Sequence, residues 1–186
     1  KDMGGSGDPS IVTAYGVYMG MKASAKFCWG KDSLSGKKIF IQGVGKVGGN
    51  LIDYLAKEGA KLIINDIDDL KVSQIAKKYN VKIIEESQMF NQDVDIYSPC
   101  ALGATLNDKN IEKLSCKIIA GAANNQLAKE GIHDILLKNK GIIYAPDFLI
   151  NAGGLINVYA ELYGLDQKRA LEKTEKIYDT TISILS

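Results

Sequence analysis

The sequence predicts an α/β protein with a doubly wound, mostly parallel sheet of about six strands and flanking helices at both ends of the chain. Short runs of Val, Ile and Leu alternate with amphipathic segments along the 186 residues, as in strand–helix–strand units. Several runs are apolar at nearly every position, which suits strands covered on both faces. A glycine-rich turn follows the first run directly, as in Rossmann-type folds.

The first element is a helix over residues 9–29. Asp8 and Pro9 form a favourable helix start, and Val12 and Met19 belong to one apolar face. Strands are then expected over residues 38–42, 61–65, 81–85, 94–98, 117–121 and 141–145. Helices are expected over residues 46–59, 68–80, 106–114, 127–141 and 150–164, with a loose connection over 85–92 and a last helical stripe from 166.

These elements predict one nucleotide-binding domain over residues 1–186. Its parts are the leading helix 9–29, a core over 37–150 and closing helices over 151–186. The chain begins with Lys1, and its last apolar stripe still runs at Ser186. We therefore expect a piece of a longer protein.

Composition excludes several classes of partner. Lys and Arg number 23 against 22 Asp and Glu, without long blocks of one sign, so neither a nucleic acid nor a polybasic membrane contact is expected. No apolar run approaches the roughly 20 residues that span a bilayer. No secretory signal is visible. A cytoplasmic protein without a membrane or nucleic-acid partner is predicted.

The cysteines and the histidine offer little chemistry. Cys28, Cys100 and Cys116 are odd in number and lack C-x-x-C spacing, which argues against a disulfide framework or a zinc site. His133 is the sole histidine and is expected on the surface of the 127–141 helix. No metal is predicted.

The glycine turn has the G-x-G-x-x-G spacing of a dinucleotide site, formed by Gly43, Gly45 and Gly48. The first glycine permits the tight turn, the second lets a pyrophosphate approach the backbone, and the third lets the helix pack on the strand. The helix N-terminus then offers free N–H groups to the anion. The alternative is a turn that binds nothing.

Asp66 follows Gly48 by eighteen residues, at the end of the second strand. A carboxylate there accepts hydrogen bonds from the adenosine ribose and repels a 2′-phosphate, which favours NAD over NADP. The alternative role for Asp66 is to cap the following helix. Lys46 and Asn65 are expected to reduce this preference for NAD over NADP.

Small and amide side chains gather near other strand ends. Residues 4–21, 97–103, 119–127 and 144–164 are rich in Gly, Ala and Asn or follow a strand. Ligands of such sheets bind at the carboxyl ends of the strands. The amides there can pair with a carboxamide or a substrate, or they can be turn and cap residues.

Several stretches resemble one family. "GGSGDPSIVTAYGVYMGMKA", "IFIQGVGKVG", "YAPDFLINAGGLINV" and "AELYG" are similar to the NAD-binding half of the leucine, phenylalanine and valine dehydrogenases, within the wider glutamate dehydrogenase family. The leucine branch is the most similar. The resemblance implies a two-domain enzyme that deaminates a branched-chain L-amino acid reversibly to its 2-oxo acid and ammonia, with NAD as cofactor.

The resemblance also implies what lies elsewhere. The family's catalytic lysines and aspartate belong to an N-terminal domain that no position here matches, so no catalytic residue is assigned and the isolated domain is expected to be inactive. That domain and the amino acid are the implied partners, and the full-length protein is expected to be a homo-oligomer. The resemblance also implies that one strand of the sheet can be antiparallel to the others.

The positions that match the family's motifs are the expected cofactor and substrate contacts. The cofactor is expected to contact Thr13, Gly43, Val44, Gly45, Lys46, Val47, Gly48, Asp66, Ile67, Cys100, Ala101, Ala122, Asn125 and Asn151, and the substrate Leu155 and Val158. Val158 stands where the glutamate enzymes carry a hydroxyl for the side-chain carboxylate, which disfavours glutamate. A phenylalanine, valine or glutamate dehydrogenase domain and a non-catalytic NAD-sensing module remain the alternatives.

Overall fold

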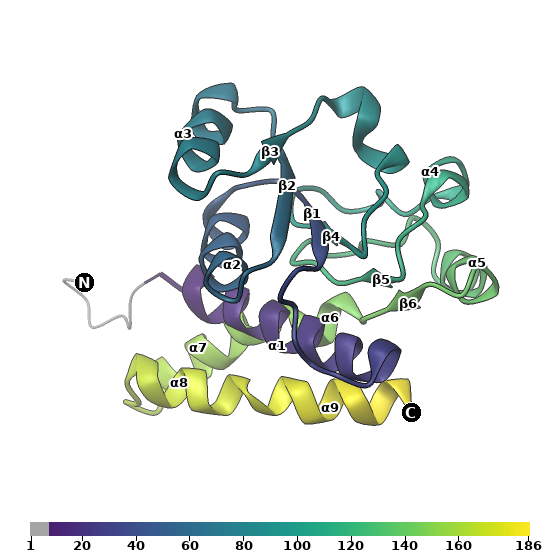
Figure 1. Cartoon of the computed structure of the whole chain (residues 1–186). Helices are drawn as coiled ribbons and strands as arrows, with labels where there is room; N and C mark the ends of the chain where they lie inside the picture. Colours follow the sequence, from purple (N-terminus) through teal and green to yellow (C-terminus); the bar gives the residue numbers. More distant parts are fainter. Residues whose placement is uncertain (1–7) are drawn as a thin grey trace.

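The sheet of the protein has six strands in the order β3-β2-β1-β4-β5-β6, all parallel (Figure 1). The structure is a computed structural model and describes residues 8–186. This order is that of a doubly wound Rossmann sheet, so the predicted fold class is confirmed. The allowance for one antiparallel strand is wrong, because every pairing between these strands is parallel. The start of the first quoted motif, residues 4–7, lies outside the described residues.

The strands are shorter than predicted after the second. They are β1 Lys38–Gln42, β2 Lys61–Asn65, β3 Lys82–Ile83, β4 Ile96–Pro99, β5 Ile118–Ile119 and β6 Ile143–Tyr144. The helices are α1 Ser10–Trp29, α2 Lys46–Lys57, α3 Asp69–Tyr79, the 3-10 helix η1 Glu86–Asn91, α4 Asp108–Lys113, α5 His133–Asn139, α6 Asp147–Ile150, α7 Gly153–Leu162, α8 Gln167–Thr174 and α9 Lys176–Leu185. None of the helices in this part of the chain is long and apolar enough to cross a membrane.

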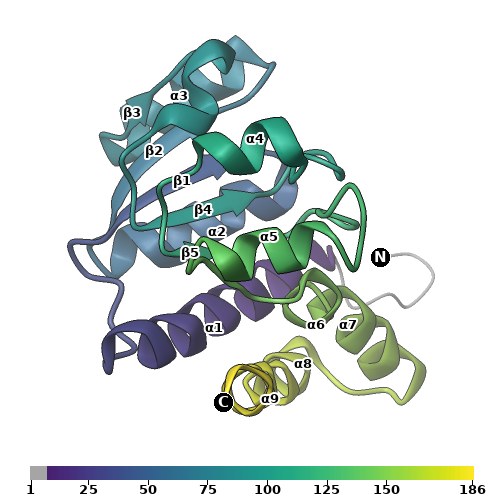
Figure 2. The ribbon, with the colours of Figure 1, turned by 90° about the vertical axis from the view of Figure 1, so that its right-hand side faces the viewer.

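The side chains of β1 point alternately to the two faces of the sheet, and each face has its own part of the hydrophobic core. Ile39 and Ile41 join the cluster formed with α1, α2 and α3, whereas Phe40 joins the cluster formed with η1, α4 and α5. Successive side chains of a strand point to opposite faces, so a strand that is apolar throughout serves both clusters. Figure 2 shows the sheet between these layers of helices.

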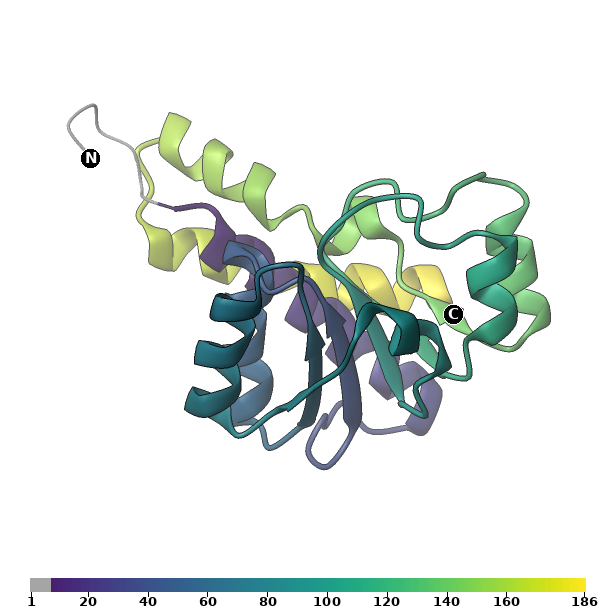
Figure 3. The same ribbon diagram turned by 90° about the horizontal axis from the view of Figure 1, so that it is seen from above.

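Helix α1 lies under the sheet and contacts α2, α7 and α9 (Figure 3). Its start differs from the prediction by one residue, because Pro9 is the N-cap and the Asp8 carboxylate accepts a hydrogen bond of 3.0 Å from the Ser10 N–H. A Cβ on Gly16 would lie 2.7 Å from the Ile150 carbonyl oxygen. The glycine is what lets α6 approach α1 so closely.

Two predicted helices have other boundaries. The expected helix over 127–141 begins only at His133, because Leu127 pairs with Leu106 in an isolated parallel bridge and is extended. The expected helix over 150–164 is divided into α6 and α7 at Asn151. In the first of these places the pairing with Leu106, distant in sequence, prevents a continuous helix.

His133 is buried, so its expected surface position is wrong. Its side chain is 1% exposed, and its Nδ1 accepts a hydrogen bond of 2.9 Å from the Lys129 N–H. Its Nε2 lies 3.5 Å from the Asp108 carboxylate at the start of α4. The histidine therefore joins the start of α5 to the preceding turn through Nδ1, while its Nε2 makes no hydrogen bond with the described residues.

Two tyrosines bind α1 to its neighbours. The Tyr18 hydroxyl donates to the Glu58 carboxylate at 2.6 Å, and the Tyr15 hydroxyl donates to the Glu175 carboxylate at 3.1 Å. Burial, and then the Glu175 carboxylate, raise the pKa of Tyr15 to about 12. Burial and then Glu58 raise the pKa of Tyr18 as well. The fold thus favours the neutral phenols.

These tyrosines predict a loss of stability in alkali. In the unfolded chain they titrate near pH 10, so their contribution is complete below about pH 10 and is lost as the pH rises through their folded pKa values. The free energy of unfolding in urea should therefore fall between pH 10 and pH 12. Replacing Tyr15 and Tyr18 together with phenylalanine should make that fall shallower. An unchanged slope would show that the two phenols do not carry it.

Candidate nucleotide site

The turn between β1 and α2 needs glycine at two of its positions for different reasons. Gly43 has φ of 95°, and a Cβ on it would lie 2.7 Å from the Ala101 Cβ. A Cβ on Gly48 would lie 2.1 Å from the Gly43 carbonyl oxygen. The first glycine therefore makes the turn beside the end of β4, and the second lets α2 pack on the turn.

Gly45 faces open space among residues 8–186. A Cβ on this residue would meet none of their atoms within 4 Å, and its φ of −60° is available to any residue. Packing within the described part of the chain therefore does not require a glycine at this position. Gly45 is also the N-cap of α2, where no side-chain oxygen caps the helix. The first N–H groups of a helix lack intrahelical partners and attract anions. The space above Gly45 is thus free for a group that approaches these N–H groups.

Asp66 connects the end of β2 to the glycine turn. Its Oδ2 accepts a hydrogen bond of 2.6 Å from the Val44 N–H, and its Oδ1 accepts one of 3.1 Å from the Asp68 N–H. The alternative role of capping α3 belongs to Asp68, whose Oδ1 accepts from the Lys71 N–H at 3.1 Å. A carboxylate has further lone pairs, so Asp66 keeps acceptor capacity for a ligand.

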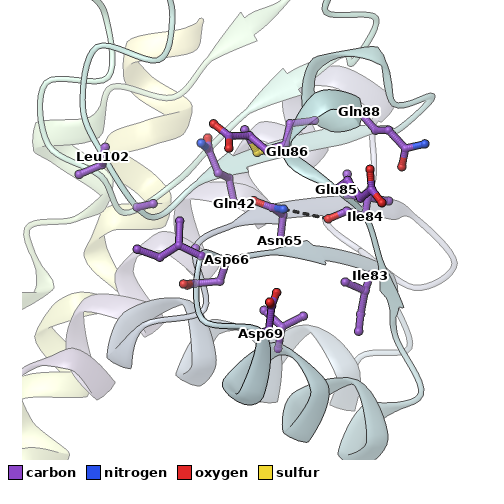
Figure 4. Close-up of a pocket in the computed structure, with 15 residues that line it drawn as sticks. Gln42, Asn65, Asp66, Asp69, Ile83, Ile84, Glu85, Glu86, Gln88 and Leu102 are labelled. Atoms are coloured by element: carbon purple, nitrogen blue, oxygen red, sulfur yellow. Dashed lines mark hydrogen bonds between the residues drawn. The ribbon is translucent and has the colours of Figure 1, made fainter.

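A pocket of about 800 Å³ opens at the carboxyl ends of β1, β2 and β3 (Figure 4). Four of the predicted residues line it: Gly43, Asp66, Ile67 and Ala101. Asn65, which was expected to affect the preference against NADP, lines it too. The lining residues that the sequence analysis missed are Gln42, Asp69, Val72, Ile83, Ile84, Glu85, Glu86, Gln88, Met89 and Leu102. Gln42, the last residue of β1, could have been found from the rule that ligands bind at strand ends.

The charge of this pocket is negative. Asp66, Asp69, Glu85 and Glu86 line it, and no lysine or arginine is among the lining residues that the structure describes. Carboxylates at this density disfavour a phosphate group in the pocket through like-charge repulsion. The pocket suits an uncharged polar ligand or one with hydrogen-bond donors.

Lys46 does not line this pocket. Its Nζ lies 3.2 Å from the Asp8 carboxylate, and its side chain is 79% exposed. Hydrogen bonds from Ser10, and then the bond and charge of Lys46, lower the pKa of Asp8. The Asn50 amide continues the connection, since it donates to the Ser10 hydroxyl at 3.2 Å and to the Lys46 carbonyl at 2.8 Å. The start of α1 is thereby fixed to the start of α2.

Cys100 lies beside the glycine turn. Its N–H donates to the Gln42 carbonyl at 2.7 Å, and a Cβ on Gly48 would lie 3.6 Å from the Cys100 Cβ. Its Sγ lies 3.3 Å from the Ser98 hydroxyl, and burial raises the pKa of its thiol. The thiol is therefore a neutral, packed group in this position.

Asn151 and Ala122 lie together at the end of β5. The Asn151 amide donates to the Ala122 carbonyl at 3.3 Å and to the Asn124 side-chain oxygen at 2.7 Å. Both bonds use the amide nitrogen, so the Asn151 Oδ1 is the group left to accept from a ligand.

The remaining predicted residues are more scattered. Asn125 has φ of 51°, and its carbonyl accepts from the Ala104 N–H at 2.7 Å, so its backbone has the turn role weighed as an alternative. The Thr13 hydroxyl donates to the Pro9 carbonyl at 2.9 Å. Leu155 and Val158 lie on α7 with 74% and 47% of their surface exposed and do not line the pocket of Asp66.

Among residues 8–186, no group of three or more His, Cys, Asp or Glu side chains is placed to hold a metal ion. The candidate site therefore consists of the glycine turn, the α2 N-terminus and Asp66, with the acidic pocket on one side and the end of β5 on the other.

The strand order and the glycine turn that leads from β1 into α2 define a Rossmann-type α/β domain. Residues 4–69 and 64–182 match the family Glutamate/Leucine/Phenylalanine/Valine dehydrogenase. The chain belongs to this family. The resemblance seen in the sequence motifs is thereby confirmed.

Individual relatives cover nearly the whole chain. A leucine dehydrogenase of Bacillus subtilis (strain 168) is 53% identical over 182 residues, which are 98% of this chain and 50% of that protein. A phenylalanine dehydrogenase of Thermoactinomyces intermedius is 47% identical over 186 residues, 99% of this chain and 50% of that protein. The crystal structure of L-tryptophan dehydrogenase from Nostoc punctiforme superposes with a TM-score of 0.94 at 42% identity, covering 96% of this chain and 55% of that one. The chain thus spans about half the length of these relatives.

Proposed function

We propose that the chain is the NAD-binding domain of an amino-acid dehydrogenase. The observation that carries the proposal is the contrast among the three glycines. Gly43 and Gly48 are required by contacts within the protein, whereas none of the described residues packs against Gly45 over the uncapped N-terminus of α2. A glycine without a packing reason, at the position where a pyrophosphate approaches the backbone, fits a dinucleotide.

The other parts of the site fit the rest of the cofactor. Asp66 accepts from the adenosine ribose, the pocket beside Ile67 and Ala101 receives the adenine, and the N–H groups of Lys46 and Val47 bind the pyrophosphate. The strand-end residues Cys100, Ala122 and Asn151 border the nicotinamide, with Thr13 and Asn125 at its carboxamide. When bound, NAD accepts the hydride that leaves the carbon bearing the amino group.

In this assignment residues 1–186 are one domain, with the leading helix 9–29, the core 37–150 and the closing helices 151–186. The chain binds and orients the cofactor, while the acid–base groups belong to a second domain of the full-length protein. A span of half the relatives' length supports this division. By itself the chain should bind NAD without turning over an amino acid.

The substrate is an amino acid with an apolar side chain, and we propose the leucine type. The relatives carry the names of leucine, phenylalanine and tryptophan, which are all apolar. Leu155 and Val158 present an exposed apolar face on α7. Val158 has no hydroxyl to pair with a side-chain carboxylate, and an unpaired buried carboxylate is costly. NADH formation by the full-length protein with a panel of amino acids separates leucine from phenylalanine, valine and glutamate.

Calorimetric titration of the chain with NAD and with NADP tests the cofactor. Saturable binding of NAD that exceeds that of NADP is the expected result. The absence of NAD binding, or a preference for NADP, would overturn the assignment. A full-length protein that binds NAD and oxidises no amino acid would favour an NAD-sensing module instead.

Asp66 should set the preference for NAD. Replacing it with asparagine keeps an acceptor for the Val44 N–H but removes one of the four carboxylates of the pocket, the one at the end of β2. We expect the ratio of NADP to NAD affinity to rise about tenfold or more, since about 1.4 kcal/mol of repulsion corresponds to that factor. Asp53→Asn, on the exposed side of α2, is the matched control and should leave the ratio unchanged. An equal ratio in wild type and Asp66→Asn would contradict this role.

A further inference from the structure

The side chain of Gln42, the last residue of β1, has a fixed orientation at the pocket. Its Oε1 accepts a hydrogen bond from the Tyr97 hydroxyl. Tyr97 is 1% exposed, with its ring stacked on Phe40 at 5.5 Å between centroids and edge-on to Phe90 at 5.9 Å. A buried ring held on two sides keeps its hydroxyl in place, and in the structure the oxygen end of the Gln42 amide faces that hydroxyl.

The other end of this amide is a donor available to the pocket. Because Oε1 is used by Tyr97, the Nε2 hydrogens of Gln42 point elsewhere, and no described residue accepts from them. Gln42 is only half-buried, so this donor is not enclosed. The pocket therefore has one amide donor of defined position among several carboxylates.

Glu86 supplies a neighbouring acceptor. It is the first residue of η1, is exposed, and lines the same pocket as Gln42. In Figure 4 the polar ends of Gln42 and Glu86 face the same part of the pocket, whereas Glu85 points to another side. A donor and an acceptor thus face the same part of a pocket that Leu102 and Met89 also line.

The Gln42 donor and the Glu86 acceptor complement the hydrogen-bonding groups of adenine but not those of hypoxanthine. Adenine carries an acceptor, the ring nitrogen N1, next to a donor, the exocyclic N6 amine. Hypoxanthine reverses both groups, with a donor at N1 and an oxygen acceptor at C6. Amide and carboxylate side chains distinguish bases through such donor and acceptor patterns. A carboxylate facing the hypoxanthine oxygen leaves two acceptors unpaired, which is unfavourable.

We propose that Gln42 and Glu86 recognise the adenine base of the dinucleotide, the Gln42 amide donating to a ring nitrogen and the Glu86 carboxylate accepting from the N6 amine. The inference rests on the proposed function, since it concerns the same site. Tyr97 is a positioning residue in it, because it acts only through the orientation of the Gln42 amide.

Binding of NAD and of nicotinamide hypoxanthine dinucleotide to the chain, measured by calorimetry, tests the proposal. We expect wild type to prefer NAD about tenfold or more, the discrimination that one good base contact provides. Glu86→Gln should bring the ratio of the two affinities close to one, because a glutamine amide both donates and accepts. Tyr97→Phe should lower the ratio too, although it removes only a hydroxyl.

Glu85→Gln is the matched control. It removes the same charge from the same pocket at the adjacent residue and should leave the ratio unchanged. Equal binding of both dinucleotides by wild type, or a ratio that Glu86→Gln and Tyr97→Phe do not lower, would overturn the base recognition while the proposed function stands. A wild-type chain that binds neither dinucleotide would overturn both. An equal fall of the ratio in Glu85→Gln would show a general charge effect and reject Glu86 as the specific acceptor.

Discussion

Gly48→Ala should lower the free energy of unfolding by about 3 kcal/mol, at the upper end of the range for overpacking. The added Cβ would lie 2.1 Å from the Gly43 carbonyl oxygen and 3.1 Å from its carbonyl carbon. Both atoms belong to the backbone of the turn, so no side-chain rotation relieves the contact. Relief requires α2 to move away from β1, which would open the core beneath Leu51 and Leu55. Urea unfolding followed by circular dichroism measures the loss.

Gly49→Ala is the control for this substitution. It changes the adjacent glycine of the same helix, where a Cβ would come no closer than 3.9 Å, to the Val44 carbonyl oxygen. Alanine in a helix is more favourable than glycine by roughly 0.5–1 kcal/mol, so this variant should be at least as stable as wild type. Equal losses at both positions, or no loss at Gly48, would contradict the packing reason given for the third glycine.

Gly45→Val should leave the fold intact and abolish NAD binding. Its Cβ meets no atom of residues 8–186 within 4 Å, and the backbone conformation suits any residue, so the melting temperature should stay near that of wild type. The valine side chain would fill the space over the α2 N-terminus where the pyrophosphate is proposed to lie. We expect the affinity for NAD to fall about 100-fold or more, equivalent to the loss of about 2.7 kcal/mol.

Calorimetry of Gly45→Val and of Gly49→Ala separates obstruction of the proposed phosphate site from a general effect of a larger side chain in this segment. The Gly49 variant should bind NAD as wild type does. If Gly45→Val binds NAD normally, the free space above Gly45 is not the phosphate site. If the variant unfolds, the structural contrast between Gly45 and Gly48 is wrong.

The glycine turn could be predicted because its information is local. Strand, turn and helix follow one another within residues 38–57. Each of the three glycines has its own geometric role, and the G-x-G-x-x-G spacing is enough to predict these roles. The structure has the turn conformation and close packing expected at Gly43 and Gly48. The hydrogen bond from Val44 to Asp66 was not predicted, although both residues were, because it depends on how β1 and β2 align.

Other features depend on contacts distant in sequence and were missed or mistaken. Leu127 is extended because it pairs with Leu106, so the helical pattern after it could not show where α5 begins. His133 looked like a surface residue, yet its burial depends on the turn and α4 around it. Gln42 is similar, because the hydrogen bond of its amide oxygen comes from Tyr97 in β4, 55 residues further along the chain.

The contact of α7 with α1 fixes the helix that carries the proposed substrate-binding side chains. A Cβ on Gly153 would lie 2.2 Å from the Val12 carbonyl oxygen, so the first turn of α7 rests on the backbone of α1. The position of α7 is therefore set independently of the exposed side chains it displays, Leu155 and Val158 among them. In the proposed function, those side chains can therefore differ between dehydrogenases of different amino acids, while α1 keeps the proposed cofactor site and the apolar face of α7 at a constant separation.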